Sequence, residues 1–349
     1  MDKTGQHTAI ISAILFGISP VACKAIVGDM QPALLAGLLY LGSGLGLAAV
    51  VLWQETPISD TFRSLSIRQL LNLAGAIISG GVAAPLFLAY GIRFGTATEV
   101  SLLLNFEAVA TTLLAWLVFK EHIGSRVWVG KLLIIAASVL VVLSHDHGSG
   151  LSIPGLSVLA ACLLWGVDNN LTRELESMPA TLLAGVKGLC AGCFNVLLAL
   201  TVFNGSATVA QISETLVIGA LSYGASLVLF IQALRKIGSA RTSTWFASGP
   251  FIGAVFSVIL LGEHPPSEYW LAALIMISGM FFLYGEMHMH HHTHDALEHS
   301  HKHDHDEHHV HVHVDVNGPH EHRHVHEPIT HYHVHWPDIH HRHSHGTEL

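Results

Sequence analysis

The sequence predicts an all-α membrane protein in which ten transmembrane helices form two inverted five-helix repeats, followed by a disordered His-rich tail. Three observations support this fold class. First, 51% of the residues are hydrophobic and only 12% are charged, with a mean hydropathy of +0.50, a composition typical of membrane proteins. Second, one long apolar segment occurs twice. Third, 24 of the 29 histidines lie after residue 287, in a stretch of quite different composition.

The repeated segment runs from Phe87 to Leu143 and again from Phe230 to Tyr284. With a single one-residue gap, the matched positions are Gly95 with Gly238, Ala97 with Ala240, Glu121-His122 with Glu263-His264, and Trp128 with Trp270. A looser match pairs Phe16-Gly17 with Trp165-Gly166. A repeat of this length indicates two copies of one structural unit. We therefore expect a first repeat over 1–145, a second repeat over 151–286 and a cytoplasmic tail over 287–349.

Ten apolar runs are long enough to be membrane spans, because about 20 helical residues cross about 30 Å of hydrocarbon. In chain order they are 7–28, 32–53, 70–92, 97–119, 127–144, 154–174, 180–203, 214–234, 240–261 and 268–286. Short polar or Gly/Pro-containing segments separate most of them, which favours tight helical hairpins.

The distribution of Lys and Arg predicts that both termini are cytoplasmic, in the plasma (inner) membrane of a prokaryote. With this orientation the inner side receives Lys3, Arg63, Arg68, Lys120, Arg126, Lys131, Arg173, Arg235, Lys236 and Arg241, and the outer loops receive Arg93. Because five spans is an odd number, the second repeat is inverted relative to the first. Inverted repeats are typical of secondary transporters that work by alternating access.

Several motifs together resemble the drug/metabolite transporter superfamily, in particular a ten-span EamA-type permease, over about residues 1–286. They are FGISPVACK at 16–24, GTATEVSLLLNFEAV at 95–109, LVFKE at 117–121, RKIGSARTS at 235–243 and LLGE at 260–263. The resemblance implies a plasma-membrane carrier, often an exporter, with a central cavity lined by both halves. It does not identify the solute, and it does not extend to the tail.

Polar residues inside the predicted spans are candidates for the transport cavity, because an ionisable group in the bilayer is costly and is functional by default. They are Lys24, Asn105, Glu107, Asp168, Asn169, Lys187 and Gln232. In one interpretation Glu107 and Asp168 exchange a proton for a cation, with Lys24 and Lys187 as counter-charges. In the alternative, these groups form structural ion pairs such as Glu107 with Lys24. Cys190 and Cys193 suit either soft metal ligation or helix packing.

The tail is predicted to bind divalent nickel, cobalt or zinc, because neutral imidazole is a ligand for these ions. The candidate ligands are His299, His301, His303, His305, His308, His309, His311, His313, His320, His322, His324 and His326. Without metal we expect the tail to be largely disordered. A hairpin with its turn at Asn317-Gly318 would place His313 opposite His322, His311 opposite His324 and Asp315 opposite His320. The alternative is a low-complexity metal sponge without fixed geometry.

Three functions fit these features. The first is efflux of a divalent transition metal, with nickel or cobalt ahead of zinc, captured by the tail. The second is export of a small metabolite such as an amino acid, since mixed Lys and Glu suit a zwitterion. The third is a membrane-anchored metal buffer or sensor. We expect no enzyme activity, no cofactor for transport and no nucleic-acid partner. The expected partners are the lipid bilayer and the carried solute or ion. The sequence is also compatible with a homodimer.

Overall fold

The computed structural model describes residues 3–54, 58–119, 125–144, 152–175, 177–237, 245–284, 288–294, 297–303, 320–326 and 329–335. The chain divides into two compact units, Met1–Gly285 and Glu286–Leu349. The described part of the first unit is helical, and the described part of the second consists of strands.

The helices of the first unit follow the predicted spans closely, and several spans contain more than one helix. The first repeat contains α1 (Lys3–Gly17), α2 (Ser19–Val27), α3 (Pro32–Trp53), α4 (Ile58–Ser64), α5 (Ile67–Ala76), η1 (Ile77–Ala83), α6 (Ala84–Phe94), α7 (Ala97–Leu103), α8 (Phe106–Phe119) and α9 (Ser125–Leu143). The second contains α10 (Ile153–Arg173), α11 (Ala180–Thr201), α12 (Val209–Ile218), η2 (Gly219–Ala225), α13 (Ser226–Ile237), α15 (Gly249–Leu261) and α16 (Ser267–Tyr284). The predicted span 32–53 coincides with α3. The part of the span 240–261 before residue 245 lies outside the described residues.

The protein is a multi-pass membrane protein. Six helical stretches among the described residues are long and apolar enough to cross a membrane: Thr4–Val27, Pro32–Trp53, Ile67–Phe94, Ala97–Leu114, Ala180–Thr201 and Val209–Phe230. Three shorter apolar helices, Trp128–Leu143, Gly249–Leu261 and Ser267–Phe282, occupy further predicted spans. The 21-residue α10 is less apolar because it carries Asp168, Asn169 and Asn170. This polar helix organises the candidate site.

Two π-helices occupy matching places in the two repeats. Each follows a ten-residue α-helix that begins with a capping box, Ser66 with Gln69 on α5 and Thr208 with Gln211 on α12. Each π-helix, η1 or η2, is seven residues long. A π-helix widens the turn and frees backbone groups, and such segments are often found at functional sites. The same local irregularity therefore occurs in the third and the eighth span.

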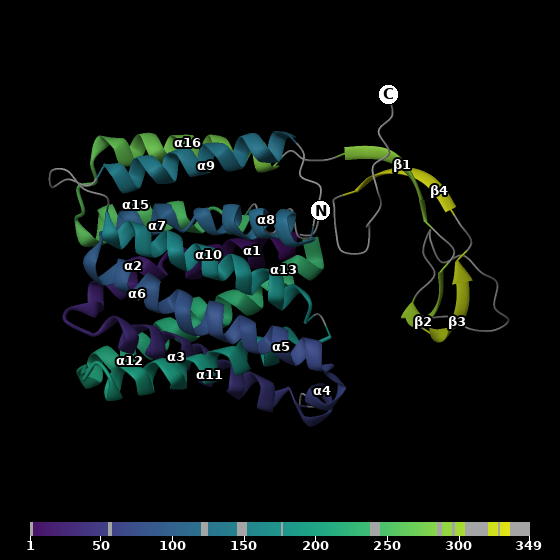
Figure 1. Cartoon of the computed structure of the whole chain (residues 1–349), viewed down its shortest axis with the longest axis horizontal. Helices are drawn as coiled ribbons and strands as arrows, with labels where there is room; N and C mark the ends of the chain where they lie inside the picture. The colour runs from purple at the N-terminus through teal and green to yellow at the C-terminus, as the bar shows by residue number, and fades with distance from the viewer. Residues whose placement is uncertain are drawn as a thin grey trace. The chain divides into compact units, whose positions relative to one another are not determined.

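Helix packing follows the two-fold pattern expected of two related repeats. Figure 1 shows α9 and α16 side by side along one edge of the bundle, and α3 and α11 along the opposite edge. Between them, α10 packs on α6 and α8, as α1 packs on α13 and α15. The α3–α11 contact is close because it is lined by glycines: a Cβ on Gly44 would lie 2.5 Å from the amide nitrogen of Leu189, and one on Gly188 would lie 2.6 Å from that of Gly44. Small residues allow this approach within a membrane.

The tail unit contains β1 (His288–His294), β2 (Leu297–His303), β3 (His320–His326) and β4 (Ile329–His335). β1 pairs antiparallel with β4, and β2 pairs antiparallel with β3. The expectation that the tail is largely disordered without metal stays a prediction. The predicted partner of His322 is wrong: it is His301 rather than His313. The physical reason is that the alternation of His with other residues also occurs over 297–303, which offers β3 a second partner strand of the same period.

Candidate functional site

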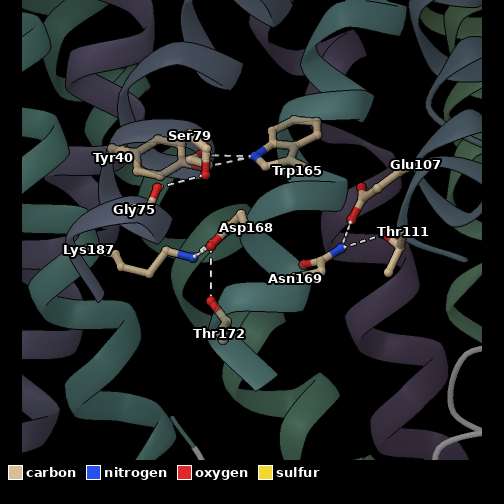
Figure 2. Close-up of polar contacts among 11 residues, drawn as sticks. Tyr40, Gly75, Ser79, Glu107, Thr111, Trp165, Asp168, Asn169, Thr172 and Lys187 are labelled. Atoms are coloured by element: carbon tan, nitrogen blue, oxygen red, sulfur yellow. Dashed lines mark hydrogen bonds and ion pairs between the residues drawn. The ribbon is translucent and has the colours of Figure 1, made fainter. Parts of the chain in front are cut away.

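Three consecutive polar residues of α10 direct their side chains to two different neighbours. Successive residues on an α-helix are rotated by about 100°, so Asp168 and Asn169 diverge. Figure 2 shows Asp168 pointing toward Lys187 of α11, and Asn169 pointing away from it toward Glu107 and Thr111 of α8. Asn170 donates to the Thr111 carbonyl at 3.1 Å and to the Gly166 carbonyl at 2.8 Å. α10 therefore connects two polar groups that lie on different sides of it.

The first polar group is a buried ion pair. The Lys187 ammonium lies 2.5 Å from Oδ1 and 2.6 Å from Oδ2 of Asp168, and the Thr172 hydroxyl donates to Oδ1 at 2.9 Å. Only 7% of the Asp168 side chain and 13% of the Lys187 side chain are exposed. Such a pair is stable away from water only when its remaining hydrogen-bonding capacity is satisfied. Here Thr172 supplies part of that requirement.

The second polar group contains a carboxylate without a cationic partner among the described contacts. Glu107 lies in the first turn of α8, directly after the break between α7 and α8 at Leu104–Asn105. Its Oε1 accepts a hydrogen bond of 2.9 Å from the Asn169 amide, which also donates to the Thr111 hydroxyl at 3.1 Å. Glu107 is partly exposed and Asn169 is exposed. Glu107 is thus directed at α10 and is partly exposed.

An aromatic and backbone cluster adjoins the ion pair at η1. The Gly80 carbonyl accepts from the Tyr40 hydroxyl at 2.7 Å and from the Trp165 indole at 3.0 Å. Any Cβ on Gly80 would overlap the Asp168 carboxylate, so this position must be glycine for the ion pair to occupy its place. The Tyr40 ring lies 5.7 Å from that of Tyr223, a residue of η2. The aromatic side chains therefore link the irregular helices of both repeats.

Lys24 does not belong to this site, which corrects both interpretations of it made from the sequence. Its ammonium donates to the carbonyls of Ile92 (2.9 Å), Arg93 (2.9 Å) and Gly95 (2.6 Å) at the end of α6. The last carbonyls of a helix have no partner within the helix and carry partial negative charge, so a cation is favoured there. Lys24 is accordingly neither a counter-charge of Asp168 nor the partner of Glu107.

Two other predicted cavity residues lie apart from Glu107 and Asp168. The buried Asn105 amide donates to the Leu102 carbonyl at 3.1 Å and to the Met276 sulfur at 3.8 Å, so it faces α16. Gln232 is exposed on α13, and none of the described hydrogen bonds joins it to the other candidates. One buried cation was missed: Lys131, assigned from the sequence to an inner loop, is 5% exposed within α9 and donates to the Ala108 carbonyl at 2.6 Å. The sequence does not distinguish a buried Lys131 from a loop residue, because Lys131 lies close to the start of its span.

The predicted metal ligands of the tail are only partly within the described residues. His299, His301 and His303 lie on β2, and His320, His322, His324 and His326 lie on β3. Histidine stands opposite histidine in the register at 299/324, 301/322 and 303/320. His305, His308, His309, His311 and His313 lie outside the described residues. The same opposition recurs between β1 and β4, at 288/335, 290/333 and 292/331.

Comparison with known proteins gives a consistent picture for the helical unit. The model of the EamA-like transporter family matches residues 3–143 and again residues 153–285. An uncharacterized transporter of Methanothermobacter thermautotrophicus is 26% identical over 298 residues, which cover 80% of this chain and 86% of that protein.

Two further relatives are described as probable amino-acid metabolite efflux pumps. The one from Salmonella typhimurium is 23% identical over 295 residues, and the one from Escherichia coli is 23% identical over 299 residues; each match covers 80% of this chain and 95% of the relative. A solved crystal structure superposes with a TM-score of 0.61 at 16% sequence identity, covering 81% of this chain and 96% of that one. That similarity concerns the fold alone.

Proposed function

The chain belongs to the EamA-like transporter family, and from this premise we propose that it exports a small zwitterionic metabolite by alternating access. The observation that carries the proposal is the pair of polar groups on α10. The Glu107 carboxylate accepts from one neutral donor among the described contacts, the Asn169 amide, and the Asp168–Lys187 ion pair lies on the other side of the helix. A carboxylate in such surroundings suits the ammonium group of an amino-acid-like solute.

The hydrogen-bond partners of Asp168 and Glu107 indicate a different role for each acid. Both oxygens of Asp168 are within hydrogen-bond distance of Lys187, so Asp168 holds the ion pair rather than the solute. Glu107 is partly exposed and can exchange Asn169 for a ligand or a proton. An acid that alternates between a proton and a cationic solute couples export to proton movement, as in other transporters with intramembrane carboxylates. The names of two relatives as probable amino-acid metabolite efflux pumps support this solute class.

Efflux of a divalent transition metal, with nickel or cobalt ahead of zinc, is the second candidate, and its support lies in the tail. Within the helical unit, Asp168 is engaged by Lys187 and Glu107 by an amide, whereas a metal site combines several carboxylate, thiolate or imidazole ligands. Cys190 and Cys193, the two closely spaced thiols, are exposed on α11. These contacts favour the organic solute over the metal ion as cargo.

For the tail, we propose divalent metal binding through cross-strand histidine pairs, with a storage or sensing role beside the carrier. The support is the register, in which histidines of β2 and β3 stand opposite one another at three successive alternate positions. Directly opposite residues of an antiparallel pair share one face, and two adjacent pairs supply four imidazoles. Metal binding would also stabilise a two-stranded ribbon that is marginal alone.

Transport into inverted vesicles tests the cargo. Vesicles holding the full chain are supplied with a panel of radiolabelled amino acids and, separately, with Ni²⁺, Co²⁺ and Zn²⁺. The proposal expects accumulation of at least one amino acid, unaffected by deletion of residues 288–349. Accumulation of a metal ion with none of the amino acids would overturn it in favour of the second candidate. The vesicle orientation assumes cytoplasmic termini, as the distribution of Lys and Arg indicates.

A further inference from the structure

The turn between α6 and α7 is held by two opposite charges from other parts of the chain. Lys24 of α2 donates to three carbonyls at the end of α6, and Glu263, in the segment between α15 and α16, accepts three hydrogen bonds at the start of α7. The Glu263 bonds come from the Ala97 amide (2.7 Å), the Thr98 amide (2.9 Å) and the Thr98 hydroxyl (2.6 Å). We call Lys24 and Glu263 the hairpin clamp.

The charges of the hairpin clamp match the ends of the helices that they hold. A cation is favoured at the carbonyl end of a helix and an anion at the amide end, and charge-assisted bonds are stronger than neutral ones. Since Glu263 belongs to the second repeat and Thr98 to the first, the clamp also joins the two repeats. A second link between them lies nearby, where the hydroxyls of Thr98 and Ser257 are 2.6 Å apart.

The residues at the clamped turn are buried. Although it lies at a helix end, the clamped turn is closed: Ala97 is fully buried and Thr98 is 2% exposed. Glu107, one helix break further into the span, is partly exposed. At the opposite end Leu175 and Met178 are buried as well, and Arg68 and Glu174 lie 3.9 Å apart at the surface.

We propose that the hairpin clamp is the gate on this side of the carrier, which the orientation from Lys and Arg makes the outer side. In this proposal the formed clamp holds α7 against the second repeat and closes the outer path to Glu107. Release of Glu263 from the α7 amides separates the repeats at this end and opens the site outward. The inference rests on the alternating-access function proposed above and adds the residues that control one of its two states.

A native cysteine can report the opening. Cys23 is fully buried on α2, directly before Lys24 and one helical turn after Ser19, whose hydroxyl donates to the Tyr223 hydroxyl at 3.2 Å. It therefore faces the interior at the clamped end. In a full-length variant with Cys162, Cys190 and Cys193 changed to Ser, a membrane-impermeant thiol reagent added to right-side-out vesicles would reach Cys23 only through an open outer gate.

The experiment compares Glu263→Gln with Glu268→Gln in that background. Glu268 is an exposed acid in the first turn of α16, whose contact is with its neighbour Ser267, so it is a matched control outside the clamp. We expect Glu263→Gln to raise the labelling rate of Cys23 from the outside at least about fivefold, and Thr98→Val to raise it less. The control should label at the rate of the parent variant.

Two outcomes would overturn the gate. Equal labelling of Glu263→Gln and Glu268→Gln would show that the clamp does not limit access. An equal increase from both membrane faces, in right-side-out and inverted vesicles, would show that Glu263 only stabilises the fold. Because labelling needs no solute, the result is independent of whether the cargo proposed above is correct. If Glu263→Gln does not reach the membrane, Thr98→Val gives the same test, since the two amide bonds to Glu263 remain.

Discussion

The Lys187 ammonium lies within 2.6 Å of both carboxylate oxygens of Asp168, across the contact between α11 and α10. This ion pair joins two spans of the second repeat beside η1 of the first. Its side chains are 7% and 13% exposed, whereas Glu107 on the other side of α10 is partly exposed. Asp168 and Glu107, which the sequence presents as similar candidates, therefore differ in the structure: the first is buried in an ion pair and the second is partly exposed.

Replacing one member of the ion pair should lower the stability of the fold more than replacing both members. Asp168→Asn or Lys187→Met alone leaves one buried charge and should lower the free energy of unfolding by about 3–5 kcal/mol. The double variant leaves none and should recover most of that loss, as measured by thermal unfolding in detergent. Arg68→Met serves as the control, because its exposed pair with Glu174 contributes at most about 1 kcal/mol. Strictly additive effects of the two single changes would contradict the pair as described.

Gly80→Ala should displace the Asp168 carboxylate. The added methyl group would overlap that carboxylate, and overpacking of this kind costs about 1–3 kcal/mol. We expect a lower unfolding temperature together with a several-fold loss of transport. Gly185→Ala is the matched control on α11, where a Cβ would lie 3.5 Å from Leu47, an ordinary contact distance. If both variants behaved alike, the effect would reflect the loss of glycine in a helix rather than the geometry at η1.

The strand register of the tail can be tested by disulfide formation. In a background without native cysteines, Ser300→Cys with Arg323→Cys should form a disulfide on mild oxidation, because these residues are register partners on β2 and β3. Val312→Cys with Arg323→Cys represents the hairpin predicted from the sequence alone. Preferential crosslinking of the second pair would contradict the observed register and restore the Asn317-Gly318 hairpin. Addition of Ni²⁺ should accelerate only the crosslink of the correct register.

Much of the helical unit follows from the sequence because a bilayer imposes length and composition on each span. The span over 32–53 and the polar positions Glu107, Asp168 and Lys187 could be recognised in this way. The partner of Lys24 could not, because a lysine near a helix end is equally compatible with an acid elsewhere and with carbonyls of a neighbouring helix. Only the packing of α2 against the end of α6 decides between them.

The π-helices were also missed, for a different reason. A span that is apolar on most faces has the same hydrophobic pattern whether its turns are α or π, so periodicity does not predict η1 or η2. Their matching positions become visible only when the two repeats are compared in the structure. The role of Trp165 and Tyr40 depends on the Gly80 carbonyl that η1 presents, and it was missed for the same reason.

The most direct test of the transport site is the exchange of Glu107 for glutamine, which keeps the shape of the side chain and removes its charge. Uptake of the transported amino acid into inverted vesicles is compared for the parent protein, Glu107→Gln and the control Glu174→Gln, at matched expression. We expect Glu107→Gln to lose at least about tenfold in uptake rate while its unfolding temperature stays unchanged. The control should take up the amino acid at the parent rate. Uptake by Glu107→Gln at the parent rate would contradict the central claim that this carboxylate takes part in transport.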